Sequence, residues 1–581
     1  DPKIYSNELS QLRIKERQVN SAISELNSQI DVIQEKLNEI AKSIYSQVKI
    51  IGITLSKLAI DSGLQKFQPE NLIIDELSTS PFPLVLVALT TPSKRAILFG
   101  DPNQLPPISI SDTQCSKLFL RRDAYEIIPH HKEVSTKLTV QRRMPESIVE
   151  FVNSAIYNGE LSTDAVIAKN RDLEIQDGNK SPFENPPFKD HQVIFVDTSS
   201  INPWCARDAN QSKYNLYSAH IVSEIIAREI GNKPEWKEKR VGIICPYRAQ
   251  KQLVKKLVQA RLGLAQLPEY LDVHTVDAFQ GEQRDIIILD LTSGQPSSPG
   301  IRLSEKTEKE IAGLRTTVSK VRRLLNVAMT RTKYQLVIIA NKKYFEREFK
   351  DTPDEYVLEI IQRASGDKVR NDLKKFHVWI DGEDLLRGES DTSKGYSPFL
   401  DENNFYQYLK QDFSKATSSV VIVSPFVTQN RVQDLKPHIQ GLLQRRVKIW
   451  IVTRPVEDAE FGVNALISLQ ELGCVVKQRK RTHEKIVIID NKIAYYGSLN
   501  VLSHKDTKEV MHRIQGEQVG QLLQQFIDVI GFAKKPQTLS AKSAIGTLTR
   551  EECSGKLKHL RWKIASQRHI PQYAVLYNQT I

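Results

Sequence analysis

The feature that most restricts the fold of this chain is a series of short apolar runs, rich in β-branched residues and separated by turns. Between residues 48 and 341 these runs read VKIIGITL, NLIIDE, RAILFG, QVIFVD, RVGIICP, RDIIILDL and YQLVIIAN. Continuous apolar runs of this length are typical of parallel strands that are buried on both faces. Helical stretches lie between the runs, and this alternation predicts an α/β architecture.

A second group of the same kind follows after residue 400. It contains SSVVIVSPF, RVKIWIVTRP, GCVVK and EKIVIIDNKIAYYG, again with helical stretches between them. Residues 351–400 separate the two groups and are charged, with Gly and Ser, as in ASGDK and DGEDLLRGESDTSKG. This composition predicts a connector between two α/β regions.

The first 47 residues have a different pattern, in which apolar residues recur in alternating steps of three and four. The series consists of Ile23, Leu26, Ile30, Ile33, Leu37, Ile40 and Ile44. Such spacing predicts a long helix with a coiled-coil seam. Because a lone helix would leave this stripe exposed, we expect a partner helix from a second chain or from a segment before residue 1.

The overall charge indicates the kind of partner. The net charge is +12 and the pI is about 9.1, which favours a polyanionic partner such as nucleic acid. The five cysteines form no CxxC pair, so a zinc site or a disulfide framework is not expected, and a reducing cytoplasm fits best. The first residues have neither a signal peptide's basic end nor its apolar core, and no apolar run is long enough for a membrane span.

Two polar loops follow predicted strands in the first group. Asp75 and Glu76 end the run NLIIDE, and a nucleotide hydrolase needs such a pair, one carboxylate for Mg²⁺ and one to polarise the attacking water. Gln104 lies in GDPNQLPP after the next run, where its amide can reach a γ-phosphate. Further along the chain stand QRRM, PYRAQ, VHTVDAFQGEQRD and LLNVAMTRTK.

The order and the sequences of these six motifs resemble those of superfamily 1 helicases of the nonsense-mediated-decay and DNA-replication type. The resemblance covers roughly residues 48–345 and implies RecA-like parallel-sheet domains with a helical stalk, which use ATP and Mg²⁺. It implies that Asp75 binds Mg²⁺, that Glu76 is the catalytic carboxylate and that Gln104 senses the γ-phosphate.

The resemblance also assigns residues in the later motifs. Arg143 and Arg331 would stabilise the charge of the transition state, and Gly281 and Glu282 would face the nucleotide. Thr54 and Thr275 would couple the nucleotide site to the nucleic-acid backbone.

The chain also departs from the family. QRRM stands where the family has QYRM, and DELS where it usually has DEAS or DEAA. No GxxxxGK[ST] phosphate loop occurs anywhere in the sequence. Since the chain also begins at Asp1, we expect a fragment whose phosphate loop lies before residue 1, or a degenerate motor that binds ATP poorly.

The second group of strands carries a further motif, THEKIVIIDNKIAYYGSLN, with His483, Lys485, Asp490, Ser498 and Asn500. A strand-end histidine can attack phosphorus, and a lysine two residues later points the same way and can hold phosphate oxygens. Ser498 and Asn500 would add hydrogen bonds, and Asp490 would orient a histidine or order the loop.

The spacing H-x-K-x4-D-x6-G-S-x-N resembles the HKD motif of the phospholipase D superfamily, which needs no metal ion. The mechanism needs a second histidine to protonate the leaving group, and the sequence holds only one HKD motif. The family completes its site with two motifs in one chain or with two chains. We therefore expect a homodimer with the site on its two-fold axis.

The basic run before the motif favours nucleic acid over phospholipid as the substrate. Lys477, Arg479, Lys480 and Arg481 lead directly into His483 and suit a phosphate backbone. No amphipathic membrane helix is evident.

The C-terminal segment resembles the start of an HRDC domain, the helical module of RecQ helicases. The matching residues are Leu557, Leu560, Arg561, Ile564, Ala565, Pro571, Tyr573 and Val575. A basic helix on the protein surface explains the same residues equally well.

The sequence thus predicts six parts. They are a stalk (1–47), part of a first RecA-like domain (48–135), a second RecA-like domain (136–350), a linker (351–400), an α/β phospholipase D-like nuclease (401–535) and a short helical HRDC-like tail (545–581). The function expected is an ATP-driven helicase or translocase joined to a metal-independent nuclease. The combination resembles antiphage proteins of the Mokosh type, which implies a defence role. The alternatives are a nucleic-acid-binding scaffold with only the nuclease active, and a lipid phosphodiesterase.

Overall fold

The computed structural model describes the chain as two compact units. The described residues are 2–109, 111, 113–122, 124–128, 133–167, 183, 185–208, 210–279, 281–300, 303, 320–352, 355–387, 400–401, 404–455, 460–479, 482–503, 509–516, 519–520 and 522–523. Of these, the first unit contains residues up to 102 and between 106 and 130, and the second contains 103–105 and everything after 130. The HRDC-like tail, Lys480 and Arg481 lie outside the described residues.

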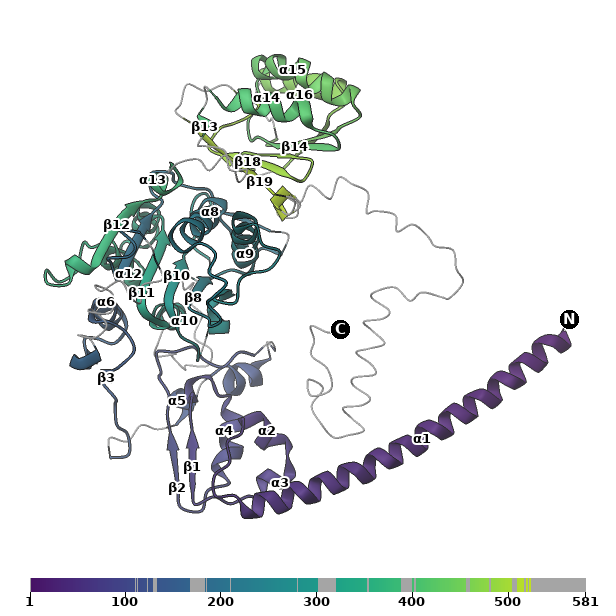
Figure 1. Cartoon of the computed structure of the whole chain (residues 1–581), viewed down its shortest axis with the longest axis vertical. Helices are drawn as coiled ribbons and strands as arrows, with labels where there is room; N and C mark the ends of the chain where they lie inside the picture. The colour runs from purple at the N-terminus through teal and green to yellow at the C-terminus, as the bar shows by residue number, and fades with distance from the viewer. Residues whose placement is uncertain are drawn as a thin grey trace. The chain divides into compact units, whose positions relative to one another are not determined.

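The first unit combines a small parallel sheet with helices. Strand β1 (Asn71–Ile74) pairs in parallel with β2 (Arg95–Leu98). The helices are α1 (Pro2–Gln47), α2 (Leu55–Ile60), α3 (Ser62–Gln65), α4 (Phe82–Leu89) and α5 (Ala124–Ile127). Figure 1 shows α1 as one long helix that extends away from the rest of this unit. Its stripe is exposed, with Leu37 at 59%, so the need for a partner helix stays a prediction.

One predicted strand of this unit is absent from the part of the chain that the structure describes. The run VKIIGITL, starting at Val48, is irregular up to Thr54, where α2 begins. Ile50 is 90% exposed. The apolar run therefore finds no sheet partner, and propensity without pairing does not make a strand.

The second unit begins with a six-stranded, fully parallel sheet in the order β12-β5-β11-β10-β8-β9. The strands are β5 (Val193–Asp197), β8 (Val241–Cys245), β9 (Leu271–Thr275), β10 (Arg284–Asp290), β11 (Thr332–Ala340) and β12 (His377–Asp381). Its helices are α6 (Glu146–Ile156), α8 (Leu216–Ile225), α9 (Arg248–Leu262), α10 (Lys320–Thr330), α11 (Lys342–Phe349), α12 (Glu355–Ala364) and α13 (Gly382–Arg387). Two-residue strands β3 (Val140–Gln141), β4 (Ser162–Thr163), β6 (Ala206–Arg207) and β7 (Lys213–Tyr214) form small ladders beside it.

Helices cover both faces of this sheet. Ile194 and Val196 of β5 pack in the core that contains α8 and α9, whereas Val193 and Phe195 pack in the core that contains α6, α10 and α12. Alternate residues of one strand are thus buried on opposite sides, as the continuous apolar runs predicted. The predicted α/β fold with a parallel helicase-type sheet is confirmed.

The linker expected over residues 351–400 is wrong for its described part. Residues Glu355–Ala364 form α12, and His377–Asp381 form β12, which pairs with β5 at the edge of the sheet. Residues 388–399 lie outside the described part.

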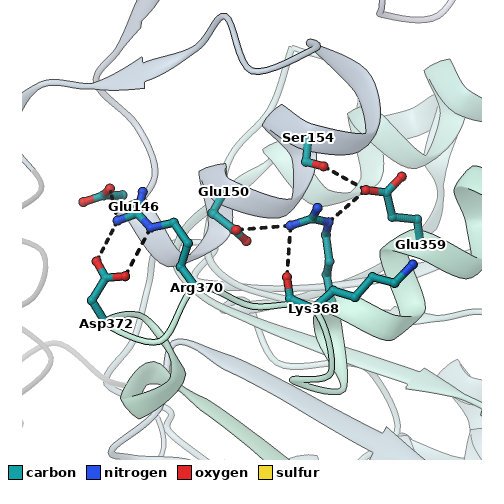
Figure 2. Close-up of polar contacts among 8 residues, drawn as sticks. Glu146, Glu150, Ser154, Glu359, Lys368, Arg370 and Asp372 are labelled. Carbon is teal, nitrogen blue, oxygen red and sulfur yellow. Dashed lines mark hydrogen bonds and ion pairs between the residues drawn. The ribbon is translucent and has the colours of Figure 1, made fainter.

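Two charged residues of this stretch, Arg363 and Arg370, form ion pairs with α6 (Figure 2). Arg370 contacts Glu146 at 2.9 Å and Asp372 at 2.7 Å, and Ser154 donates to Glu359 at 2.8 Å. Arg363 reaches Glu150 at 3.1 Å and Glu359 at 3.0 Å. These contacts fix the helix that follows the QRRM motif.

A mixed seven-stranded sheet follows, in the order β13-β19-β18-β17-β14-β15-β16. Its strands are β13 (Leu400–Asp401), β14 (Ser419–Val423), β15 (Lys448–Thr453), β16 (Val475–Gln478), β17 (Ile486–Ile489), β18 (Ile493–Gly497) and β19 (Val510–Gln515). Helices α14 (Phe405–Lys415), α15 (Gln429–Gln444) and α16 (Glu460–Glu471) accompany it. Val420 and Ile422 pack in the core with these helices, while Val421 and Val423 join the core that contains α8. The helicase layer and the second sheet therefore share one apolar core inside the second unit.

Candidate active sites

Gln104, expected to sense the γ-phosphate, lies near the end of α10 together with the two arginines expected to stabilise the transition state. This helix carries the LLNVAMT sequence, and Arg331 follows it directly with a 1% exposed side chain. Arg331 Nη2 donates to Gln104 Oε1 at 2.9 Å, and Arg143 Nη1 donates to the carbonyl of Thr330 at 2.8 Å. Asn326 also holds the Gln104 loop, by donating to the carbonyl of Asn103 at 2.9 Å. Three motifs that are far apart in the sequence thus meet at one point.

The acidic pair lies in the first unit, at the carboxyl end of β1. Glu76 has φ 53°, in the left-handed region that non-glycine residues rarely adopt, and its N–H donates to Asp75 Oδ1 at 2.9 Å. Gly100 begins the GDPNQLPP loop beside it. A Cβ on Gly100 would lie 2.9 Å from Leu77 Cβ, so this close approach of the two loops requires glycine.

The other residues that the helicase resemblance singled out have local contacts of their own. Gly281 and Glu282 are exposed, and Glu282 pairs with Arg284 at 2.6 Å. Thr275 is half-buried at the end of β9. Thr54 caps α2, where its Oγ1 accepts from the Lys57 N–H at 3.2 Å. For Thr54 the structure therefore shows a capping contact.

The HKD residues come together through the antiparallel hairpin of β17 and β18. Ile486 pairs with Tyr496, and the Gly497 N–H donates to the carbonyl of Lys485 at 3.2 Å. This register brings the start of the GSLN loop beside the histidine and the lysine. Lys485 Nζ lies 3.4 Å from His483 Nδ1, and Ser498 lines the same cavity.

The surroundings of His483 favour its neutral, nucleophilic form. Burial, the Lys485 ammonium and the Arg454 guanidinium hold the pKa of His483 below its ordinary value of 6.5. Arg454 was not singled out by the sequence, because nothing in the local spacing indicated that it faces the histidine. Its Nε donates to the carbonyl of Thr482 at 2.5 Å.

Glu484 was also missed, since it stands between the motif positions. Its Oε2 accepts from the His483 N–H at 2.9 Å, and its Oε1 pairs with Arg479 at 2.7 Å. Arg479, expected to guide nucleic acid, thus also holds the loop around the histidine. Lys477 is half-buried on β16.

Asp490 lies at the opposite end of β17 from His483. Its carboxylate accepts from the backbone N–H groups of Thr417 at 2.8 Å, Ser418 at 2.7 Å and Ser419 at 2.9 Å. Burial alone would raise the pKa of Asp490, but these hydrogen bonds outweigh it and lower the pKa to about 2. Of its two expected roles, ordering a loop is the one that these contacts support.

Asn500 is buried at 5% exposure and closes the GSLN loop. Its N–H donates to Glu509 Oε2 at 3.2 Å, so Glu509 fixes the loop that presents Ser498. Among the described residues no group of three or more His, Cys, Asp or Glu side chains could hold a metal ion. Nor is any helix among them long and apolar enough to cross a membrane.

The parallel sheet with its Gln104 and Arg331 cluster, and the hairpin with its HKD residues, define helicase-type AAA domains joined to a phospholipase D-like domain. Models described as "AAA domain" match residues 3–112 and 120–343, and a model described as "Cardiolipin synthase, PLD-like domain" matches residues 409–530. Both domain types are those of hydrolytic enzymes. The resemblance to helicases and to the phospholipase D superfamily is thereby confirmed.

Curated relatives match the helicase part. DNA polymerase alpha-associated DNA helicase A of Saccharomyces cerevisiae is 32% identical over 49% of this chain and 40% of its own length. Regulator of nonsense transcripts 1 of Dictyostelium discoideum is 28% identical over 50% of this chain and 20% of its own. The chain thus spans less than half the length of these relatives. Among solved structures, the phospholipase D family member Nuc from Salmonella typhimurium is 19% identical over 23% of this chain and 90% of its own, with a TM-score of 0.20.

Proposed function

We propose that the protein is a nucleic-acid phosphodiesterase whose HKD site is joined to a helicase-type motor. The observation that carries the nuclease is the grouping of His483, Lys485 and Ser498 around one cavity, with Lys485 Nζ 3.4 Å from His483 Nδ1. A neutral imidazole, a cation and a hydroxyl are the groups that a metal-independent phosphoryl transfer needs.

The reaction follows from these groups. A ring nitrogen of His483 attacks phosphorus, a P–N bond forms, and the bond from phosphorus to the leaving sugar oxygen breaks as that oxygen takes a proton. Water then attacks phosphorus while the group that protonated the sugar oxygen takes a proton from it, the P–N bond breaks, and a phosphomonoester leaves. Lys485 and Ser498 stabilise the charge on the nonbridging oxygens in both steps.

The proton for the leaving oxygen requires a second acid, and we propose that a second copy of the chain supplies its His483 in a homodimer. Mixing an excess of His483→Ala chains with wild-type chains tests this proposal. A dimeric site predicts that activity per wild-type chain falls. A protein that is monomeric by light scattering and still cleaves the substrate would contradict the dimeric site.

The substrate that we propose is DNA or RNA rather than a phospholipid. Supporting observations are the basic residues Lys477 and Arg479 near the site, with Lys480 and Arg481 following in the sequence, and a helicase partner domain. The printed names of the relatives, a DNA helicase and a regulator of nonsense transcripts, fit this choice. Turnover of phosphatidylcholine that is lost in His483→Ala would instead favour a lipid phosphodiesterase.

For the motor, we propose that Gln104, Arg143 and Arg331 hold the γ-phosphate end of ATP, while Asp75 binds Mg²⁺ and Glu76 positions water. The contact of Arg331 with Gln104 at 2.9 Å fits that role. Gly281 and Glu282 would lie on the nucleotide side, and Thr54 and Thr275 would contact the nucleic-acid backbone. ATP supplies the energy for movement along the strand when it is bound.

A scaffold that binds nucleic acid without hydrolysing ATP is favoured by one observation, the absence of a GxxxxGK[ST] loop from the sequence. Binding of a fluorescent ATP analogue to this chain separates the two functions. Mg²⁺-dependent binding that weakens in Arg331→Ala supports the motor, and no binding supports the scaffold. The biological role that we propose, by analogy with helicase–phospholipase D proteins, is defence against phage, for which plaque counts with and without His483→Ala are the test.

A further inference from the structure

An exposed aromatic side chain, Phe426, stands on the HKD sheet close to the end of β14. It is 44% exposed, although its neighbours Pro425 and Val427 are buried. A single exposed apolar side chain is common on proteins, so its surroundings decide whether it has a role. Three features of these surroundings are the strand register, a neighbouring arginine and the loop that carries the ring.

The strand register places Phe426 at the same edge of the sheet as His483. Val423, which ends β14, pairs with Ile486, which begins β17. Because these two strands are antiparallel, the chain after Val423 and the chain before Ile486 leave the sheet at the same edge. The exposed ring and the expected nucleophile therefore belong to one edge of one sheet.

Arg454 connects the ring to the histidine. Its guanidinium carbon lies 5.2 Å from the centroid of the Phe426 ring, which is within the range of a cation–π contact. Its Nε donates to the carbonyl of Thr482, the residue before His483. The same positive charge contributes to the low pKa of His483. A single side chain thus contacts the ring and the loop of the nucleophile.

Hydrogen bonds hold the loop that presents Phe426. Ser424 Oγ donates to the carbonyl of Phe426 at 2.8 Å and accepts from the Leu502 N–H at 3.2 Å. Thr453 Oγ1 donates to the carbonyl of Pro425 at 3.3 Å. Because the backbone is fixed before a ligand arrives, a flat ligand can pack on the ring with little further ordering of the loop.

The charges at this edge indicate the kind of ligand. Lys477 and Arg479 lie at the end of the neighbouring strand β16, and the Arg479 N–H donates to the carbonyl of Thr453 at 2.8 Å. An exposed ring among cations suits a strand that offers phosphates to the cations and an unpaired base to the ring. In a duplex the bases are already paired and stacked, and freeing one costs free energy. The headgroup of a phospholipid offers no aromatic ring.

We propose that Phe426 stacks on an unpaired nucleobase of the strand whose phosphodiester His483 attacks, and that the substrate is therefore single-stranded nucleic acid. The inference rests on the proposed nuclease function and adds a base-binding position to it. Arg454 supports the ring through its cation–π contact. Because every base has a flat face, this position accepts any base, and cleavage shows little preference for sequence.

The test compares Phe426→Leu with Phe426→Tyr in the full chain. Leu keeps an apolar side chain without a flat face, whereas Tyr keeps the ring. Phe119→Leu is the matched control, because Phe119 is 46% exposed and belongs to the first unit. The substrates, in EDTA, are oligo-dT and oligo-U, each beside an oligomer of the same backbone that lacks bases, and a DNA duplex. Thermal unfolding shows whether each variant folds as the wild type does.

We expect Phe426→Leu to lose about tenfold in kcat/KM on the strand with bases, as for one lost stacking contact, and to keep its kcat/KM on the strand without bases. Phe426→Tyr and Phe119→Leu keep both values. The loss should appear with whichever of oligo-dT and oligo-U the wild type cuts, which identifies the strand that supplies the base.

Unchanged cleavage of the strand with bases by Phe426→Leu would overturn the inference while leaving the nuclease intact. An equal loss on strands with and without bases would also overturn it, because Phe426 would then act through Arg454 or through a contact between two copies of the chain. A wild type that cuts the duplex as fast as the single strand would overturn it as well.

If the wild type cuts none of these substrates, the proposed function fails, and crosslinking decides the inference separately. Oligo-dT that carries 5-iodouracil is irradiated with the full chain, since this base bonds preferentially to an aromatic ring that is stacked on it. A crosslinked peptide that contains Phe426 would support a base-binding position without cleavage. Crosslinks at other residues alone, or none at all, would overturn the inference.

Discussion

His483 shows how neighbouring charges set the working pH of a single residue. Because burial, Lys485 and Arg454 hold its pKa below 6.5, the neutral imidazole persists in mildly acidic solution. Cleavage that needs the neutral form should therefore rise with pH along a limb that lies below pH 6.5.

Arg454→Gln tests this electrostatic account. Removing one positive charge should raise the pKa of His483, so the acidic limb of kcat/KM should move to higher pH. The measurement is a pH–rate profile in EDTA for both proteins. A limb that stays in place, or moves to lower pH, would show that Arg454 does not act on the histidine.

Asp490 belongs to the HKD motif but is expected to stabilise the fold rather than take part in the reaction. Asp490→Ala removes the acceptor of three backbone N–H groups at the start of β14 and should cost about 1–2 kcal/mol of unfolding free energy. Because its folded pKa of about 2 lies below the ordinary 3.8, its stabilisation is present above about pH 4 and is lost as pH falls through about 2.

Urea unfolding measures that loss, and cleavage at low temperature measures the chemistry. We expect Asp490→Ala to keep most of its cleavage where it is folded. If the variant has normal stability and no longer cleaves the substrate, Asp490 is required for catalysis.

At the scale of elements, the sequence predicted most of the strands but not all of the boundaries between domains. Continuous apolar runs such as Val193–Asp197 can be recognised as strands in the sequence, because both faces of the strand are buried. β12 and β19 were missed, since His377–Asp381 and Val510–Gln515 mix polar and apolar residues near the edge of a sheet. The charges around α12 suggested a solvent-exposed linker, whereas Arg363 and Arg370 pair with Glu150 and Glu146 of α6.

The α6–α12 contacts predict a stability effect. The Arg363 side chain is only 17% exposed and pairs with Glu150 and Glu359. Arg363→Met therefore removes the guanidinium that pairs with both carboxylates. We expect a loss of about 1–3 kcal/mol in urea unfolding.

Lys94→Met is the matched control, because the Lys94–Glu70 pair is exposed at 60% and 65% and should contribute about 0–1 kcal/mol. Equal small losses in the two variants would mean that α12 is not anchored through Arg363.

At the scale of the whole molecule, the sequence predicted which domains are present but not how they share a site. The motif spacing placed Lys485 beside His483, since both stand on one strand end. It said nothing of Tyr217, which matches no motif and lines the same cavity because α8 packs against β18 and β19. The common core of the helicase layer and the HKD sheet depends on tertiary contacts that no local pattern encodes.

This shared core should be acid-sensitive. His512 on β19 is buried among Tyr496, Tyr217 and His220, with Glu224 nearby. Burial, with a smaller effect from His220, lowers the pKa of His512 to about 3. Near pH 6.5 His512 therefore binds a proton in the unfolded chain but not in the folded chain. The free energy of unfolding should fall by up to about 1.4 kcal/mol per pH unit between about pH 6.5 and pH 3.

His512→Phe keeps a ring stacked on Tyr496 and removes the titration. Urea unfolding between pH 7 and 4.5 should show a shallower loss of stability in the variant than in the wild type. Parallel curves would assign the acid sensitivity to other groups.

We propose that this chain cuts nucleic acid with His483 and without a metal ion. The most direct test is to incubate the full chain in EDTA with labelled single- and double-stranded DNA and RNA, beside His483→Ala. We expect cleavage of at least one substrate that survives EDTA and vanishes in the variant. Cleavage that persists in His483→Ala, or that EDTA abolishes, would contradict it.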